Sequence, residues 1–298
     1  MSELFTFGCS FTSYNWSTWA DILGREFDHY ENHGRGGAGN TYIFNSILQC
    51  IAERKISESS TVIVMWSNTI REDRYVGNDW IAPGCIYNQN TYNEGFMEYV
   101  DPVGFFIRDC AHISAALLAL EHTGCQYIFL SMMPLDNAKE YLRLSWTQQL
   151  LNNDIVSEYK RKYQIFFDLV RPSMLDVVYR GNWYNRRSEL VKDRSWYKQL
   201  HVPDNYFYDQ KPEDSILPTI QDLEYGNINR NSRSTSFLLD KMNAETIEEI
   251  LEFRLWERVD HHPTPLLHLE YLQKVLPEFT ISEENIQRVI DENSALPK

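Results

Sequence analysis

Short apolar runs that alternate with helix-like segments constrain the fold of this chain most strongly. The run Thr61–Trp66 is nearly continuous in β-branched and apolar residues, which is typical of a strand buried on both faces of a parallel sheet. Leu4–Phe7 and Gln126–Ser131 have the same character, and a further extended piece is expected near Tyr30. Strands that alternate with helices predict βαβ units and a doubly wound α/β fold.

Apolar residues recur at helical spacing between and after these strands. Ser17 is expected to cap the first helix. A long apolar helix is expected to end at Gly124, whose freedom from a Cβ suits a helix C-terminus. The stretch from Arg74 to Gly104 reads as loop. The expected helices run through Trp19–Phe27, Ile43–Ile51, Phe105–Glu121, Ala244–Trp256, Pro265–Val275 and Ser282–Glu292.

The regular alternation weakens after about Pro134, which predicts a division of the chain. Residues 136–240 are rich in Tyr, Trp, Asn and Arg and contain loop-like stretches with Pro and Gly. We expect a catalytic core formed by residues 1–135 and 241–298. Residues 136–240 are expected to be an insertion over the sheet edge or the active site, acting as a lid or a binding subdomain.

Composition and charge limit the partners. The 298 residues are 43% hydrophobic and carry a formal net charge of −14. A field of that sign disfavours nucleic acid and anionic membranes. No run is expected to span a bilayer, and Met1–Glu3 enters a strand without the regions of a signal peptide. The five cysteines include no closely spaced pair, which favours reduced thiols and a cytoplasmic location. For a viral chain this means the host cytoplasm or the virion. The sequence does not indicate an oligomeric state.

Four clusters of small or polar residues could carry chemistry. Three of them follow a strand, and ligands bind at the carboxyl ends of strands in open α/β sheets. These three are therefore expected on one rim of the sheet. The clusters are Gly8-Cys9-Ser10, the loop Gly34–Asn40, Trp66-Ser67-Asn68, and Asp260-His261-His262-Pro263.

The chemistry that these residues suit is acyl transfer, which needs a nucleophile, a base and donors for a developing oxyanion. Ser10 supplies a hydroxyl and His262 a base, with His261 as the alternative base. Asp260 can orient the imidazole. The N–H groups of Ser10 and Gly37 and the side-chain amide of Asn68 can form the oxyanion hole.

The four clusters, in this order, resemble the Ser, Gly, Asn and His blocks of the SGNH, or GDSL-type, hydrolases. Cys9 stands where that family usually has Asp, and Trp66 where it usually has Gly. One residue separates Asp260 from His262 instead of the commoner two. The resemblance covers about the first 135 residues and the last 60. The tail Pro263–Leu272 resembles SGNH-like proteins of phages and marine microbes.

The resemblance implies a three-layer α/β/α sandwich with a five-stranded parallel sheet, flavodoxin-like in arrangement, and ester hydrolysis without a metal or other cofactor. A metal site of Asp260, His261, His262 and His268 matches no standard zinc spacing. The glycine loop matches neither a dinucleotide fingerprint nor a P-loop. Arg71, Glu72 and Asp73 are expected to form a structural ion-pair set behind the site.

A basic and aromatic stretch inside the insertion offers candidate substrate contacts. Aromatic faces beside guanidinium groups suit sugars, anionic glycans or single-stranded nucleic acid, and the acidity of the chain favours a glycan. The alternative is a solvated helical surface with its aromatic residues packed inward. The candidate contact residues of this stretch are Trp183, Tyr184, Arg186 and Trp196, and Trp66 at the end of the Thr61–Trp66 run is a further candidate.

The sequence therefore leaves two hypotheses for the function. The first is a serine esterase that acts on a small-molecule or glycan ester, for example an O-acetylated carbohydrate. The second is a non-catalytic structural or glycan-binding protein, such as a virion component, that keeps the fold. The position of His262 relative to Ser10 distinguishes them, because only an enzyme needs the imidazole within reach of the hydroxyl.

Overall fold

The computed structural model describes residues 2–82, 84, 100–135, 153–179 and 262–295. These residues belong to one compact unit with the bounds 1–182 and 262–296; the second unit, 183–261 with 297–298, lies outside the described residues. The strands are β1 (Glu3–Gly8), β2 (His29–Gly34), β3 (Ser60–Trp66), β4 (Arg74–Val76), β5 (Asp79–Ile81) and β6 (Gln126–Ser131). The helices are α1 (Trp19–Gly24), α2 (Asn40–Ala52), α4 (Pro102–Thr123), α6 (Asp154–Lys162), α7 (Gln164–Leu169), α8 (Met174–Tyr179), α13 (Pro265–Val275) and α14 (Glu283–Ala295).

The centre of the fold is a parallel sheet with the strand order β2-β1-β3-β6. The predicted strands are confirmed, including the piece near Tyr30, which lies in β2. The stretch predicted as loop from Arg74 instead begins with the antiparallel hairpin of β4 and β5. All seven residues of β3 are buried, as expected for a central strand covered on both faces.

The fifth strand that the family resemblance implied is reduced to a single bridge in the described residues. Val170 pairs with Phe129 of β6 in the parallel sense, and the Arg171 N–H donates to the Phe129 carbonyl at 2.9 Å. The bridge lies between the short helices α7 and α8. The described sheet therefore has four strands, with one further residue pair at the outer edge of β6.

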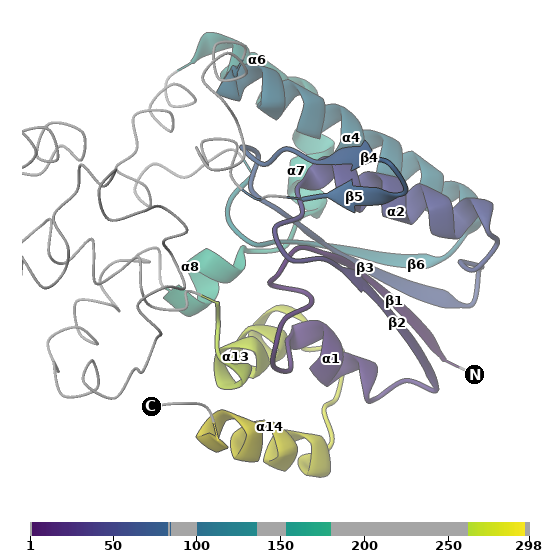
Figure 1. Ribbon diagram of the computed structural model, residues 1–298, viewed down its shortest axis with the longest axis vertical. Helices are drawn as coiled ribbons and strands as arrows, with labels where there is room; N and C mark the ends of the chain where they lie inside the picture. The colour runs from purple at the N-terminus through teal and green to yellow at the C-terminus, as the bar shows by residue number, and fades with distance from the viewer. Residues whose placement is uncertain (1, 83, 85–99, 136–152, 180–261, 296–298) are drawn as a thin grey trace, which may run out of the picture. The chain divides into compact units, whose positions relative to one another are not determined.

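Helices cover the sheet on both faces, which confirms the predicted α/β sandwich (Figure 1). On one face, α2 and α4 pack side by side and bury Ile43, Ile47, Ile113 and Leu117 against the strands. On the other face lie α1, α13 and α14; α13 contacts both α1 and α14, and α14 also contacts α1, where the Asn285 Nδ2 donates to the Ile22 carbonyl at 2.7 Å. The C-terminal helices therefore belong to the same layered unit as the N-terminal strand.

The N-cap of α1 lies one residue later than the predicted cap, Ser17. Thr18 is the N-cap, and the Asp21 carboxylate accepts its backbone N–H at 2.9 Å, as in a capping box. The Ser17 hydroxyl instead accepts a hydrogen bond from Arg25. The predicted cap was wrong by one position because Thr18 has the acidic partner three residues later.

Helix α4 is longer than expected and is the core helix of its layer. Asp101 accepts the Val103 N–H at 2.9 Å, Pro102 occupies the first turn, and Gly124 ends the helix with φ +75°. By length and composition alone this helix could cross a membrane, so the expectation that no run could do so was wrong. Helix α4 packs on α2 and the sheet. The core helix of a folded protein can have the same length and apolar composition as a membrane-spanning helix.

Residues 153–179, which the sequence assigned to the insertion, pack onto the layered unit. Helix α6 contacts α4, and α8 contacts α13. The Tyr271 hydroxyl of α13 donates to the Pro172 carbonyl at 2.9 Å. Most of the range 136–240, and the helix expected at Ala244–Trp256, lie outside the described residues. The predicted division at 135/136 and 240/241 therefore stays a prediction.

Candidate active site

The parallel register brings the ends of the strands to one edge of the sheet. Gly8 at the end of β1 lies opposite Gly34 at the end of β2, and the Arg35 N–H donates to the Gly8 carbonyl at 3.1 Å. Trp66 at the end of β3 lies opposite Ser131. The loops that carry Ser10, Gly37 and Asn68 therefore leave the sheet at the same edge, as predicted from their positions after strands.

Ser10 lies in a tight turn directly after β1. The Cys9 carbonyl accepts the N–H groups of Thr12 and Ser13 at 2.9 and 3.1 Å. A Cβ on Gly8 would lie only 2.0 Å from the Thr12 hydroxyl oxygen, so the turn requires glycine there. Cys9 is fully buried, with its Sγ 3.7 Å from the Met132 sulfur. The thiol therefore faces the interior, and Ser10, which is 5% exposed, stays the candidate nucleophile of this turn.

The chain returns to this turn about 250 positions later, at His262. The imidazole stacks on the Tyr14 ring, with the centroids 3.8 Å apart and the planes inclined by 20°. It also meets the Phe11 ring edge-on at 5.6 Å. The Trp16 indole N–H donates to the Pro263 carbonyl at 2.8 Å. His262 thus lies against the residues that directly follow Ser10, while Asp260 and His261 lie outside the described residues.

Gly37 occupies a backbone conformation that L side chains rarely adopt. Its φ is +75°, and an added Cβ would lie 2.2 Å from the Ala82 carbonyl oxygen. A glycine is needed both for the turn and for this close approach of the chain after β5.

Asn68 has its carboxamide oriented by a local turn. The Asn68 Oδ1 accepts the Ile70 N–H at 3.1 Å, an Asx-type turn. Because a backbone N–H needs an acceptor, the oxygen must face Ile70, and the Nδ2 donor end points elsewhere. Asn68 is partly buried. The donor end of the carboxamide therefore faces away from the Ile70 N–H.

Two side chains, those of Asp73 and Arg71, join the Gly37 loop and the start of α2 to the chain that follows Asn68. Asp73 accepts the N–H groups of Gly39 and Tyr42 at 2.8 and 2.9 Å, which caps the start of α2. The Arg71 guanidinium donates to the Ala38 carbonyl at 2.9 Å. Burial raises the pKa of Asp73, and its two backbone hydrogen bonds oppose that shift.

The expected ion-pair set of Arg71, Glu72 and Asp73 was therefore wrong in its pairing. Glu72 pairs with Arg108 at 2.9 Å and with Arg74 at 3.5 Å. Asp73 serves as a helix cap, and Arg71 binds a backbone carbonyl. Sequence reasoning missed Arg108 because it lies on α4, 36 positions after Glu72.

Trp66 does not fit the substrate contact predicted for it. Its side chain is fully buried in the core beneath α2 and α4, where it meets Phe129 edge-on at 5.6 Å. A core position at the end of a doubly covered strand leaves no surface for a ligand. The other candidate contacts, Trp183, Tyr184, Arg186 and Trp196, lie outside the described residues.

His268 on α13 is fully buried, and neither ring nitrogen has a hydrogen-bond partner in the described part of the chain. Burial, with a smaller effect from His262, lowers the pKa of His268 to about 3, so the ring is neutral at ordinary pH. No group of three potential metal ligands occurs among the described residues. Asp260 and His261 of the considered metal set are outside them.

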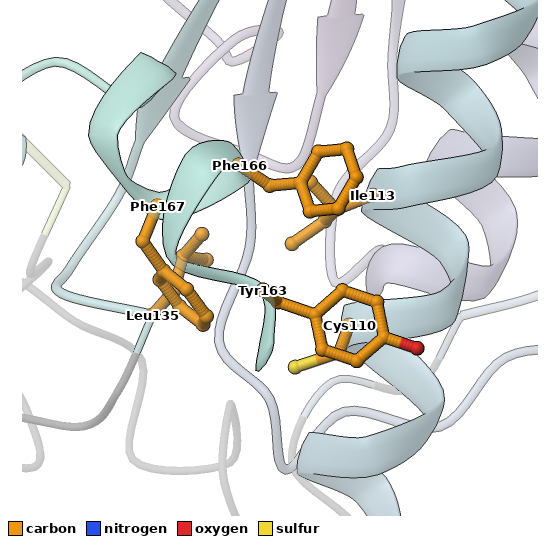
Figure 2. Close-up of a pocket in the computed structure, with 6 residues that line it drawn as sticks. All are labelled: Cys110, Ile113, Leu135, Tyr163, Phe166 and Phe167. Carbon is orange, nitrogen blue, oxygen red and sulfur yellow. The ribbon is translucent and has the colours of Figure 1, made fainter. Parts of the chain in front are cut away.

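A small apolar pocket lies between α4 and α7 (Figure 2). Figure 2 shows that Cys110 and Ile113 line it from α4, opposite Tyr163, Phe166 and Phe167, with Leu135 beside them. Burial raises the pKa of Cys110 to about 12, so its thiol stays protonated. The pocket offers mainly apolar contacts, and no residue of the Ser10 turn lines it.

Comparisons with known proteins give matches of fold only. No family model matches the sequence, and no curated protein matches it. Three similar solved structures are a lipolytic G-D-S-L family protein of Veillonella parvula, a putative acylhydrolase of Bacteroides fragilis and an acetyl xylan esterase. Their identities are 12%, 11% and 10%, and their TM-scores are 0.29, 0.30 and 0.32.

The matches cover 64%, 62% and 66% of this chain and 83%, 68% and 83% of the three others. Identities and TM-scores this low carry no argument about the activity of the present chain. The case for a function therefore depends on its own residues. The resemblance of the tail to phage and marine proteins stays a prediction.

Proposed function

We propose that this protein is a serine esterase of the SGNH type. Ser10 is the nucleophile, His262 the general base and Asp260 the residue that orients His262. The Ser10 and Gly37 N–H groups and the Asn68 carboxamide form the oxyanion hole. The observation that carries the proposal is the contact of the His262 ring with Tyr14 and Phe11, in the turn that presents Ser10.

The proposed reaction begins with attack of the Ser10 hydroxyl on the ester carbonyl. The His262 imidazole takes the hydroxyl proton as the new C–O bond forms, and the carbonyl electrons move onto the oxygen. The three donors of the hole stabilise that negative charge. When the tetrahedral intermediate collapses, the alcohol leaves with the proton held by His262, and the acyl group remains on Ser10.

Water then completes the cycle. His262 removes a proton from a water molecule, which attacks the acyl-enzyme carbonyl through a second oxyanion. Collapse of this intermediate releases the carboxylic acid and returns the proton to Ser10. No metal or cofactor takes part in the proposed sequence, and both halves use the same base and the same oxyanion donors.

For the substrate we propose an acylated carbohydrate, such as an O-acetyl sugar. Aromatic side chains beside the Gly37 loop support this choice. Tyr75 on β4 is 60% exposed, and its ring meets that of Trp80 on β5 at 5.6 Å. The same hairpin continues to Ala82, whose carbonyl abuts Gly37. Exposed aromatic faces provide contact area for a sugar ring at low entropic cost.

The test is turnover of p-nitrophenyl acetate by the wild type, by Ser10→Ala and by Ser13→Ala as a matched control in the same turn. The wild type and Ser13→Ala should hydrolyse the ester at similar rates. Ser10→Ala should lose at least about 10³-fold in kcat, since nucleophile removal leaves only binding and the oxyanion hole. Equal turnover by Ser10→Ala contradicts the enzyme proposal and favours the non-catalytic glycan-binding alternative.

A further inference from the structure

A buried carboxamide links the two loops that carry the candidate oxyanion donors. Asn40, the first residue of α2, has no exposed surface. Its Oδ1 accepts the Ser67 N–H at 2.7 Å, and its Nδ2 donates to the Ser67 carbonyl at 3.2 Å. One side chain therefore holds both backbone groups of the residue that directly precedes Asn68.

Asp109 on α4 fixes the orientation of that carboxamide. The Asn40 Nδ2 donates to the Asp109 Oδ2 at 2.6 Å. The donor end of Asn40 must face the carboxylate, and its acceptor end must face the Ser67 N–H, so only one orientation satisfies both partners. Asp109 is 2% exposed. Leaving any of these buried groups without its partner would carry a desolvation cost.

Arg108, next to Asp109 in α4, holds the following part of the same loop. Its guanidinium pairs with the Asp109 carboxylate at 3.0 Å and with Glu72 at 2.9 Å. It also donates to the carbonyls of Thr69 and Arg71 at 3.3 and 2.9 Å. Arg108 therefore binds the loop after Asn68 directly, while Asp109 acts on the residue before Asn68 through Asn40.

We propose that Asn40 and Asp109 are positioning residues that set the placement of the Asn68 carboxamide relative to the Gly37 N–H. The proposal rests on the proposed function, in which these two groups bind the oxyanion. Asn40 follows Gly37 by three positions and binds Ser67, the residue before Asn68, so it connects the two loops that carry the donors. Donors that are already in place need no reorganisation when charge develops in the transition state.

The kinetic test compares Asn40→Ala, Asn68→Ala and the double variant, with Asn45→Ala as the matched control. Asn45 is an exposed asparagine on the same helix. Asn40→Ala should lower kcat about 100-fold and change KM less than about threefold, since misplacing a donor by about an ångström has that effect. The double variant should be no slower than Asn68→Ala, because Asn40 acts through Asn68. Asn45→Ala should match the wild type.

A second measurement detects the hydrogen bond between the Ser67 N–H and the Asn40 Oδ1 independently of catalysis. Amide hydrogen exchange at Ser67 should speed up at least about tenfold in Asn40→Ala, while exchange in β3 stays slow. Asp109→Asn provides the same test if Asn40→Ala does not fold. It keeps an oxygen acceptor for Asn40 but loses the charge, so its effects on kcat and on Ser67 exchange should be in the same direction and smaller.

The outcomes separate the two proposals. Unchanged exchange at Ser67 in a folded variant overturns the inference, whether or not the protein is an enzyme. A double variant slowed by the product of the two single effects also overturns it, because the residues then act independently. If Ser67 exchange responds but the wild type shows no Ser10-dependent turnover, the proposed function fails, and with it the assignment of Asn40 and Asp109 to an oxyanion hole.

Discussion

The two halves of the candidate site are built from different interactions. The oxyanion half is held by buried hydrogen bonds, with Asn40, Asp73 and Asp109 binding backbone or side-chain groups of the two loops at 2.6 to 3.2 Å. In the base half, the rings of Tyr14 and Phe11 contact the imidazole of the partly buried His262. A buried polar network fixes direction, while ring stacking restricts a side chain less.

This difference matches what each half would do. Donors for an oxyanion act best when they are immobile before the reaction. A general base must take a proton from one atom and deliver it to another, and active-site hydrogen bonds of this kind often tighten only when substrate is bound. Changes in the oxyanion half should therefore affect the rate more than changes in the ring contacts of His262.

Among the variants that distinguish the oxyanion half from the base half, Asn68→Ala is expected to have the largest effect on kcat. Removing one oxyanion donor should lower kcat by about 10²- to 10³-fold with little change in KM, because the lost hydrogen bond is strongest in the transition state. Steady-state kinetics on p-nitrophenyl acetate measure this. A variant that raises KM and keeps kcat would instead place Asn68 in ground-state binding.

The next largest effect is expected on the pH dependence of folding stability, to which Asp109 contributes. Burial raises the pKa of Asp109 from 3.8 to about 6, against the lowering effect of Arg108 and Asn40. The folded protein therefore holds this proton more tightly than the unfolded chain. Its contribution to stability is present below about pH 4 and is lost as the pH rises to about 6, by about 3 kcal/mol.

Urea unfolding of the wild type and Asp109→Asn between pH 3.5 and 6.5 (roughly the span of the two pKa values) measures this. The wild type should lose stability relative to the variant as the pH rises. Burial lowers the pKa of the nearby His112 to about 4, but both proteins share that titration, so it cancels in the difference. A difference that is constant with pH would mean that Asp109 titrates normally.

The smallest effect should come from Tyr14→Leu, which removes the ring stacked on His262. Such ring contacts contribute about 0.5–1.5 kcal/mol, so kcat should fall roughly 3- to 10-fold. Tyr159→Leu, which removes a stacked tyrosine from α6, is the control. A loss as large as that of Asn68→Ala would contradict the difference between the two halves.

The layered fold could be predicted because its signals are local in the sequence. The continuous apolar run in β3 and the helical spacing in α2 and α4 appear within single elements. The Gly8 and Gly37 turns could be expected from small residues after strands. Helix boundaries shifted where a cap depended on a particular partner, as with Thr18 and Asp21.

The polar network behind the site could not be predicted, because its partners are far apart in the sequence. Asn40 binds Asp109 across 69 positions and Ser67 across 27. The only sequence signal was an asparagine directly after the glycine loop, at the expected start of a helix. Trp66 was misjudged for the opposite reason: its position beside Ser67 and Asn68 suggested the site, but strand alternation directs its side chain into the core.

The most direct test of the account is labelling with a fluorophosphonate probe, followed by mass spectrometry of the peptides from the wild type and from His262→Ala. If His262 activates Ser10, the wild type should carry one adduct, on Ser10. The rate of Ser10 labelling should fall at least about 10²-fold in His262→Ala. No adduct on Ser10, or labelling of Ser10 at the same rate without His262, would contradict the pairing of this hydroxyl with this imidazole.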